Sequence, residues 1–257
     1  MKIFLLGFLL SFLAVAQSDA ISFPDRNSFT AVSKVSSGSL EASTPSFNLE
    51  KGDQIFVHVA KDNLSSGDGE TNEVMSVVDS LGNIYNKIKE YSNGQGKKQA
   101  GVVTAMFLAT NLNETPLVDE PFTVTVHFST ANVVAKAAAV QRVISDHPLE
   151  MVEGAFAFLA NDNANPGPMD LNLSSEPYGE YLWVRTMGLE GDWVNFFETP
   201  SYFDWGTDGT TGGGTASNIS VAYEADVSTG TSNPSDPAAI NVDCVSILLA
   251  FREKSVP

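Results

Sequence analysis

The densest group of side chains that could bind a ligand is aromatic. Six aromatic residues fall within residues 193–205, beside three aspartates and around a single proline. Aromatic faces with neighbouring carboxylates suit stacking on sugar rings. The candidate ligand-binding residues are therefore Trp193, Phe197, Tyr202 and Trp205. The alternative is that these side chains pack in the core or at a subunit contact.

A second group consists of oxygen donors on a loop that contains glycine. Asp62, Asp68 and Glu70 lie close together in the sequence, and carboxylate oxygens are the ligands that calcium prefers. The twelve-residue calcium loop that joins two helices is absent. These three residues are a tentative calcium site, and an acidic loop in contact with solvent is the alternative.

Sequence motifs of catalysis are absent. The chain lacks Gly-x-Ser-x-Gly, the phosphate-binding loop, the dinucleotide-binding glycine pattern, His-Glu-x-x-His and paired Cys-x-x-Cys. The glycines at 212–214 lack the following lysine that phosphate binding needs. Two carboxylates acting on a glycosidic bond cannot be positioned from sequence, so a glycan-active enzyme stays open. The prediction is a protein without catalytic activity.

Charge restricts the partners. The chain of 257 residues has 31 Asp and Glu against 14 Lys and Arg, a net charge of −17. Nucleic-acid binding is driven by Lys and Arg that displace counterions from phosphates, so nucleic acid is excluded as an expected partner. The acidic balance is compatible with divalent cations or with solubility alone.

The N-terminus has the features of an export signal. Lys2 precedes an apolar run over residues 3–15, which is too short to span a membrane as a helix. Small residues favour cleavage after Ala16 or Ala20, so residues 1–20 are predicted to be a signal peptide. We expect a secreted protein, at an extracellular surface or in a virion, without a membrane span after processing. The single cysteine, Cys244, excludes an intrachain disulfide.

The remaining chain has the pattern of an all-β protein. Short runs of alternating apolar and polar residues recur between clusters of Gly, Asn, Asp, Ser and Pro. Alternation places His58 and His127 opposite the main apolar rows of their strands. The run of alanines at 137–139 could be helical, but the surrounding valines favour a strand. Strands are predicted at 40–49, 54–59, 73–78, 84–90, 102–109, 122–128, 136–144, 153–159, 181–187, 219–225 and 240–251.

The two halves of the chain are similar to each other. Residues 52–57 match 179–184, residues 105–109 match 220–225, and residues 137–143 match 245–251, in the same order. The connection between the halves is short, which favours one domain over two. We predict a single jelly-roll-like or immunoglobulin-like β-sandwich over residues 21–257, with halves at about 21–160 and 161–257.

The order of these segments resembles a loosely defined class of β-sandwich modules. The matching segments are Gly52–Val57, Val77–Tyr85, Met106–Asn111 and Phe122–Ser129. Such modules occur in secreted and surface proteins of bacteria and in structural proteins of phages. The resemblance implies a fold and an extracellular or virion setting, and it implies no catalytic residue.

These features lead to one expected function and one alternative. We expect an exported structural or adhesive subunit that self-associates into a surface filament, a coat or a virion shell. The alternative is a secreted carbohydrate-binding module that binds surface glycans through its aromatic segment.

Overall fold

Every regular element that the structure describes is a β-strand. The structure is a computed structural model, and it describes residues 21–22, 28–33, 35–45, 49–50, 52–64, 68–93, 101–110, 112, 121–164, 169, 171–173, 180–190, 204–209, 219–228, 231–232 and 242–254. The all-β prediction is confirmed. The predicted signal peptide at residues 1–20 lies outside the described residues. Nothing in the described part of the chain is a helix long and apolar enough to cross a bilayer.

The strands form three large antiparallel sheets and one small sheet. The outer sheet has the order β3 (Ser39–Thr44), β8 (Phe122–Phe128), β5 (Val74–Asp79). The central sheet has the order β1 (Ile21–Ser22), β9 (Lys136–Ser145), β4 (Gln54–Asp62), β7 (Val102–Ala109), β6 (Asn86–Asn93), and β2 (Ser28–Ser33) also pairs with β9. The facing sheet has the order β10 (Leu149–Ala164), β16 (Val242–Glu253), β12 (Tyr181–Glu190), β14 (Ile219–Ser228), β13 (Asp204–Gly209). The small sheet pairs β11 (Leu171–Asn172) with β15 (Thr231–Ser232).

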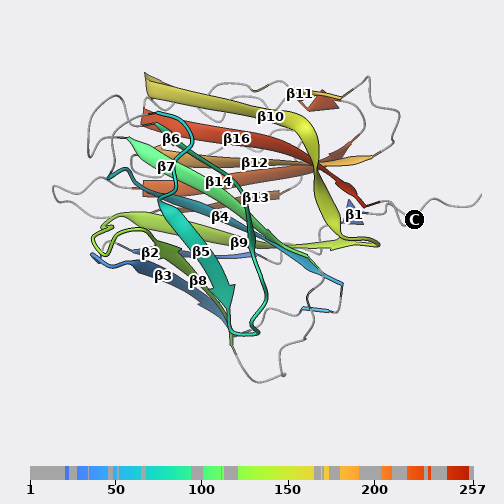
Figure 1. The fold of residues 1–257 in the computed structure, drawn as a ribbon, viewed down its shortest axis with the longest axis horizontal. Helices are drawn as coiled ribbons and strands as arrows, with labels where there is room; N and C mark the ends of the chain where they lie inside the picture. Colours follow the sequence, from blue (N-terminus) through green and yellow to red (C-terminus); the bar gives the residue numbers. More distant parts are fainter. Residues whose placement is uncertain are drawn as a thin grey trace, which may run out of the picture.

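The sheets are stacked in layers. In Figure 1, β3 and β8 of the outer sheet lie at the bottom of the view, β9 and β4 of the central sheet lie above them, and β10, β16 and β12 of the facing sheet lie toward the top. Buried clusters fill the space between the outer and central sheets and between the central and facing sheets. The central sheet is thus covered on both faces, which explains why β4 and β7 are buried almost throughout and why β7 is almost entirely apolar. The layered arrangement confirms a sandwich-like architecture, and whether it is jelly-roll-like or immunoglobulin-like stays a prediction.

Alternation along β4 directs its side chains into two different cores. Ile55, Val57 and Val59 pack between the central and outer sheets. Phe56 and Ala60 point the other way, into the space between the central and facing sheets. Each of these side chains is fully buried, so β4 helps to hold both layers in place.

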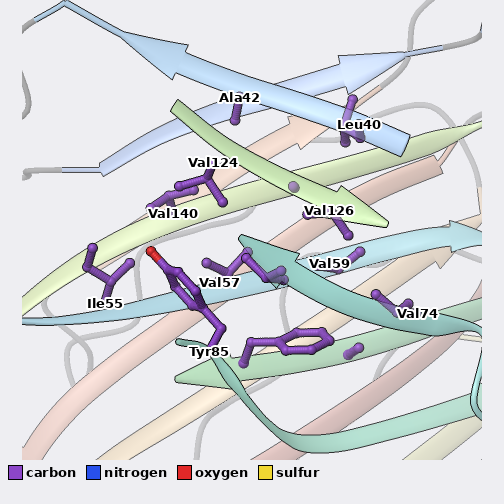
Figure 2. Packing of buried hydrophobic residues seen from close by; sticks show 14 of the residues in the cluster. Leu40, Ala42, Ile55, Val57, Val59, Val74, Tyr85, Val124, Val126 and Val140 are labelled. Carbon is purple, nitrogen blue, oxygen red and sulfur yellow. The ribbon is translucent and has the colours of Figure 1, made fainter. Parts of the chain in front are cut away.

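The first core joins the outer sheet to the central sheet. Val124 and Val126 of β8 lie across from Val57 and Val59 of β4 in Figure 2, and Val140 of β9 completes this part of the cluster. Burying such a side chain contributes about 1.5–3 kcal/mol each. A core of this size is therefore sufficient to hold the outer sheet without disulfides.

The second core joins the central sheet to the facing sheet. Phe56 of β4 meets Phe251 of β16 edge to face, with ring centroids 5.0 Å apart. Gly188 of β12 lies against β7, where an added Cβ would be 2.9 Å from a methyl carbon of Val102. The packing of β12 against β7 at this position therefore requires a residue without a side chain.

The central and facing sheets have the same strand order. The order β9-β4-β7-β6 in one sheet corresponds to β16-β12-β14-β13 in the other, antiparallel in both. This agrees with the similarity that sequence indicates between β4 and β12, β7 and β14, and β9 and β16. The sequence match of β4 to β12 is out of register by an odd number of residues, because it equates Phe56 with Trp183. Phe56 faces the second core, whereas Trp183 lies on the opposite face of its sheet.

Several strand boundaries differ from the sequence-based prediction, whereas the strand predicted for the alanine run is confirmed. Strand β10 begins at Leu149 and pairs with β16 of the facing sheet. If the first half of the chain ends before Leu149, and not near residue 160, it contributes no strand to the facing sheet. The alanine run belongs to β9, which pairs with β2 on one side and β4 on the other. Pairing on both sides outweighs the helix propensity of three alanines, since propensity amounts to a few tenths of a kcal/mol per residue.

Candidate functional site

The aromatic segment is described only in part. Trp193, Phe197 and Tyr202 lie outside the described residues. Trp205 belongs to β13, where its backbone pairs with Glu224 of β14, so this residue lies in a strand and not in a loop. β13 is the end strand of the facing sheet. The carbohydrate-binding surface stays a prediction.

The three tentative calcium ligands occupy two different environments. Asp62 is the last residue of β4, whereas Asp68 and Glu70 precede β5. The carboxylate of Glu70 pairs with the Lys89 ammonium of β6 at 2.7 Å. No three His, Cys, Asp or Glu side chains among the described residues form a group that could hold a metal ion. The structure therefore does not bring these three carboxylates together into such a group.

Asp62 instead lies near a second carboxylate from the facing sheet. Burial, together with the nearby charge of Glu190, raises the pKa of Asp62 to about 6, against the opposing effect of the Lys61 charge. The carboxylate of Glu190 accepts a hydrogen bond from the backbone N–H of Gly101 at 2.8 Å. This contact ties the end of β12 to the start of β7, so the acidic pair lies at the junction of the central and facing sheets.

The acidic segment after Asp68 runs along the edge of the central sheet. Gly69 and Ser92 of β6 exchange two backbone hydrogen bonds of 2.9 and 2.8 Å. The ammonium of Lys87 donates to the Asn72 side chain at 2.6 Å, beside the ion pair of Lys89 with Glu70. A covered edge is protected from pairing with another chain, so these contacts assign this segment a structural role.

A buried network of charges fixes the start of β5. Lys61 of β4 forms a buried ion pair with Glu73, and its ammonium donates to the carbonyl of Asp62 at 2.6 Å. Glu90 of β6 accepts hydrogen bonds from the backbone N–H groups of Glu73 and Val74, at 2.5 and 3.1 Å. Burial lowers the pKa of Lys61, while the carboxylates of Glu73 and Glu90 oppose that shift. The network positions the outer sheet over the central sheet.

A neutral histidine lies at the centre of the second core. His58 of β4 is fully buried, and its Nδ1 is 2.6 Å from the hydroxyl of Thr186 on β12. Its Nε2 is 3.3 Å from the side-chain oxygen of Gln141 on β9. The ring of Tyr223 on β14 stacks on the imidazole at 4.6 Å with an angle of 2°. One side chain thus connects four strands of two sheets.

Sequence reasoning placed His58 correctly but did not reveal its surroundings. Alternation assigned it to the face opposite Ile55, Val57 and Val59, and the structure confirms this. The available signal was Phe56, an aromatic residue on the same face, which indicates that this face is also covered. His127 lies exposed on β8 in the outer sheet, so the two histidines belong to different layers.

The His58–Thr186 pair has the residue types of a base and a nucleophile, but its surroundings exclude substrate. His58 and Thr186 are fully buried, and Tyr223 is 1% exposed. Burial lowers the pKa of His58 to about 3, while the hydrogen bond that its ring donates to the side-chain oxygen of Gln141 acts in the opposite direction. A base needs a reactant within hydrogen-bonding reach, and no such space is open between the two packed sheets. The arrangement stabilises the interface.

The outer sheet ends in a strand with apolar side chains facing solvent. Among the described strands, β5 pairs with β8 alone. Met75 and Val78 of this strand are 49% and 44% exposed, and Ile84 in the following turn is 80% exposed. Asp79 holds this turn by accepting hydrogen bonds from the backbone N–H groups of Leu81 and Asn83. We call β5 with Ile84 the β5 edge.

Comparison with known proteins identifies no relative. No family model, no curated protein and no solved structure matches the chain. The function must therefore be argued from the geometry and chemistry of the chain itself.

Proposed function

We propose that the protein is an exported structural or adhesive subunit, without catalytic activity, that self-associates into a surface filament, a coat or a virion shell. The observation that carries the proposal is the β5 edge, a regular strand at the end of a sheet that presents Met75 and Val78 to solvent. Exposed strand edges with apolar side chains are templates for association with another chain.

The use of the polar side chains supports a role without catalysis. Lys61 and Glu73 pair with each other, and Glu90 binds the backbone at the start of β5. His58 and Thr186 are enclosed between two sheets. In the described part of the chain, these charged and nucleophilic groups therefore act in holding the layers together.

The export part of the proposal rests on the sequence. The apolar run at residues 3–15 and the small residues before Gln17 and Ile21 have the pattern of a cleaved signal. The proposed setting outside the cell also agrees with the resemblance to secreted, surface and phage modules. Mass spectrometry of the protein isolated from its native source should give an N-terminus at Gln17 or at Ile21.

The assembly part is tested with the processed chain. Light scattering and electron microscopy should reveal ordered oligomers, filaments or shells that grow with protein concentration. A chain that remains monomeric up to its solubility limit, both with calcium chloride and with EDTA, would contradict the proposal. The calcium comparison also tests whether Asp62, Asp68 and Glu70 have any role in association.

The carbohydrate-binding module remains the second proposal, because Trp205 lies on β13 at the end of the facing sheet. Trp193, Phe197 and Tyr202 would complete the sugar-binding surface. A glycan array that binds the wild-type chain but not Trp205→Ala would support this function, and the absence of binding by the wild type would reject it.

A further inference from the structure

The geometry points to the β5 edge as the surface through which a second copy of this chain binds, by antiparallel pairing of β5 with β5. This inference rests on the proposed function and makes it specific, since it names the strand that associates. Pairing of this kind would join the outer sheets of two copies into one continuous sheet about a twofold axis.

Among the described residues, the backbone of β5 has unused hydrogen-bonding capacity on the side away from β8. The N–H of Ser80 donates to the carbonyl of Thr123 at 2.9 Å, which places Ser80 at a position that bonds toward β8. In an antiparallel ladder such positions alternate along the strand, so Val78 also bonds toward β8. The N–H and C=O groups of Val77 and the N–H of Asp79 therefore point toward the open edge, whereas the carbonyl of Asp79 accepts the N–H of Gly82 in the turn at 3.2 Å.

The side chains of β5 suit association between identical strands. The strand contains Val74, Met75, Val77 and Val78, with no lysine, arginine or proline, so it lacks the usual residues that block edges. Its single charge is Asp79 at the C-terminal end. Antiparallel pairing with a second copy about Val78 places each Asp79 opposite Val77 of the other copy, so the two carboxylates do not lie directly opposite each other.

The bulge in β5 limits where pairing takes place. The register with β8 shifts between Val74 and Ser76, so Met75 is the extra residue. From Ser76 to Asp79 the pairing with β8 is regular. The regular part is the segment available to the second copy, with Val78 at its centre on the outward face.

The neighbouring edge of the central sheet is unavailable, which singles out β5. Gly69 already pairs with Ser92 of β6, and Glu70 pairs with Lys89. On the other side of the outer sheet, β3 presents the exposed carboxylate of Glu41 and packs beside β2. Of these three edges, only the β5 edge combines open backbone groups with exposed apolar side chains.

The net charge predicts how salt affects this association. Two copies that each carry a charge of −17 repel each other, so screening by salt should strengthen binding between them. Binding to a basic protein would instead weaken as salt is added. The effect of salt on the strength of association therefore distinguishes binding to a second copy from binding to a cationic partner.

The test is sedimentation velocity of the processed chain and two variants over a range of concentrations and salt. Val78→Lys places a charge on the β5 edge, and Val35→Lys is the control because Val35 is 71% exposed and lies away from β5. Both substitutions change the net charge equally. We expect the wild type and Val35→Lys to associate, more strongly at high salt. We expect Val78→Lys to associate about tenfold or more weakly, because it replaces the apolar contact between two Val78 side chains by two lysine charges that face each other.

Each outcome is decisive. Association of Val78→Lys equal to that of the wild type would overturn the β5 inference while leaving the proposed function intact. An equal loss in both variants would also overturn it, because the effect would then be one of charge alone. A wild type that does not associate would reject both the inference and the proposed function.

Discussion

His58 shows how a single buried side chain can make the stability of the molecule depend on pH. Its imidazole joins Gln141, Thr186 and Tyr223, and burial keeps it neutral. A histidine whose pKa is lowered in the folded state stabilises that state less as pH falls below its unfolded value of 6.5. The interface of the central and facing sheets should therefore weaken in acid.

We predict that His58→Gln removes part of this pH dependence. With pKa values of 6.5 unfolded and about 3 folded, His58 should account for a loss of about 2 kcal/mol in the free energy of unfolding between pH 7 and pH 5. Urea denaturation at the two pH values measures the loss. The control His127→Gln, on the exposed face of β8, should lose as much stability between pH 7 and pH 5 as the wild type does. An identical pH slope in His58→Gln and wild type would contradict this account.

At the scale of elements, the contact between β4, β5 and β6 depends on a buried ion pair. Lys61 and Glu73 are both buried, and Glu90 holds the start of β5. Removing one member of a buried pair leaves an uncompensated charge, whereas replacing both by apolar residues is often neutral. The pair thus determines where β5 of the outer sheet packs on the central sheet more than it determines the stability of either sheet.

We predict a loss of about 3–5 kcal/mol in the free energy of unfolding for Lys61→Met. The double variant Lys61→Met with Glu73→Leu should recover most of this loss, because neither member of the pair is then left buried without its partner. Chemical denaturation of the two variants and the wild type provides the comparison. A single variant as stable as the wild type would show that the charge of Glu73 is solvated.

The elements themselves were largely predictable from sequence. The predicted bounds of β7 and β8 match the structure, because their runs of apolar or alternating residues are bordered by turn residues. The sequence did not reveal that the second face of β4 is buried, since period-two patterns describe one strand and not the sheet above it. The correspondence of the halves stays a prediction, since it equates Phe56 with Trp183 although these two side chains belong to different clusters.

The candidate site was less predictable than the strands. Asp62 and Glu70 are close in the sequence but have different surroundings, because Asp62 ends β4 near Glu190 whereas Glu70 lies on the following segment and pairs with Lys89 of β6. The β5 edge had no sequence signal of its own. Its exposure follows from strand order, which depends on non-local pairing that sequence alone does not specify.

At the scale of the whole molecule, the packing of the central and facing sheets requires a residue without a side chain at one position of β12. Gly188 of β12 lies over Val102 and Thr104 of β7, with no room for a Cβ. We predict that Gly188→Ala lowers the free energy of unfolding by about 1–3 kcal/mol through overpacking. Adding Val102→Ala should restore part of the loss. Thermal unfolding of the single and double variants tests this, and additive losses would contradict it.

The central claim is that this layered molecule is a subunit that assembles with copies of itself. The most direct measurement is sedimentation velocity of the processed wild-type chain across protein concentration at low and high salt, with electron microscopy of the same samples. The account predicts species larger than the monomer that increase with concentration and with salt. A single monomeric species under all these conditions would contradict it.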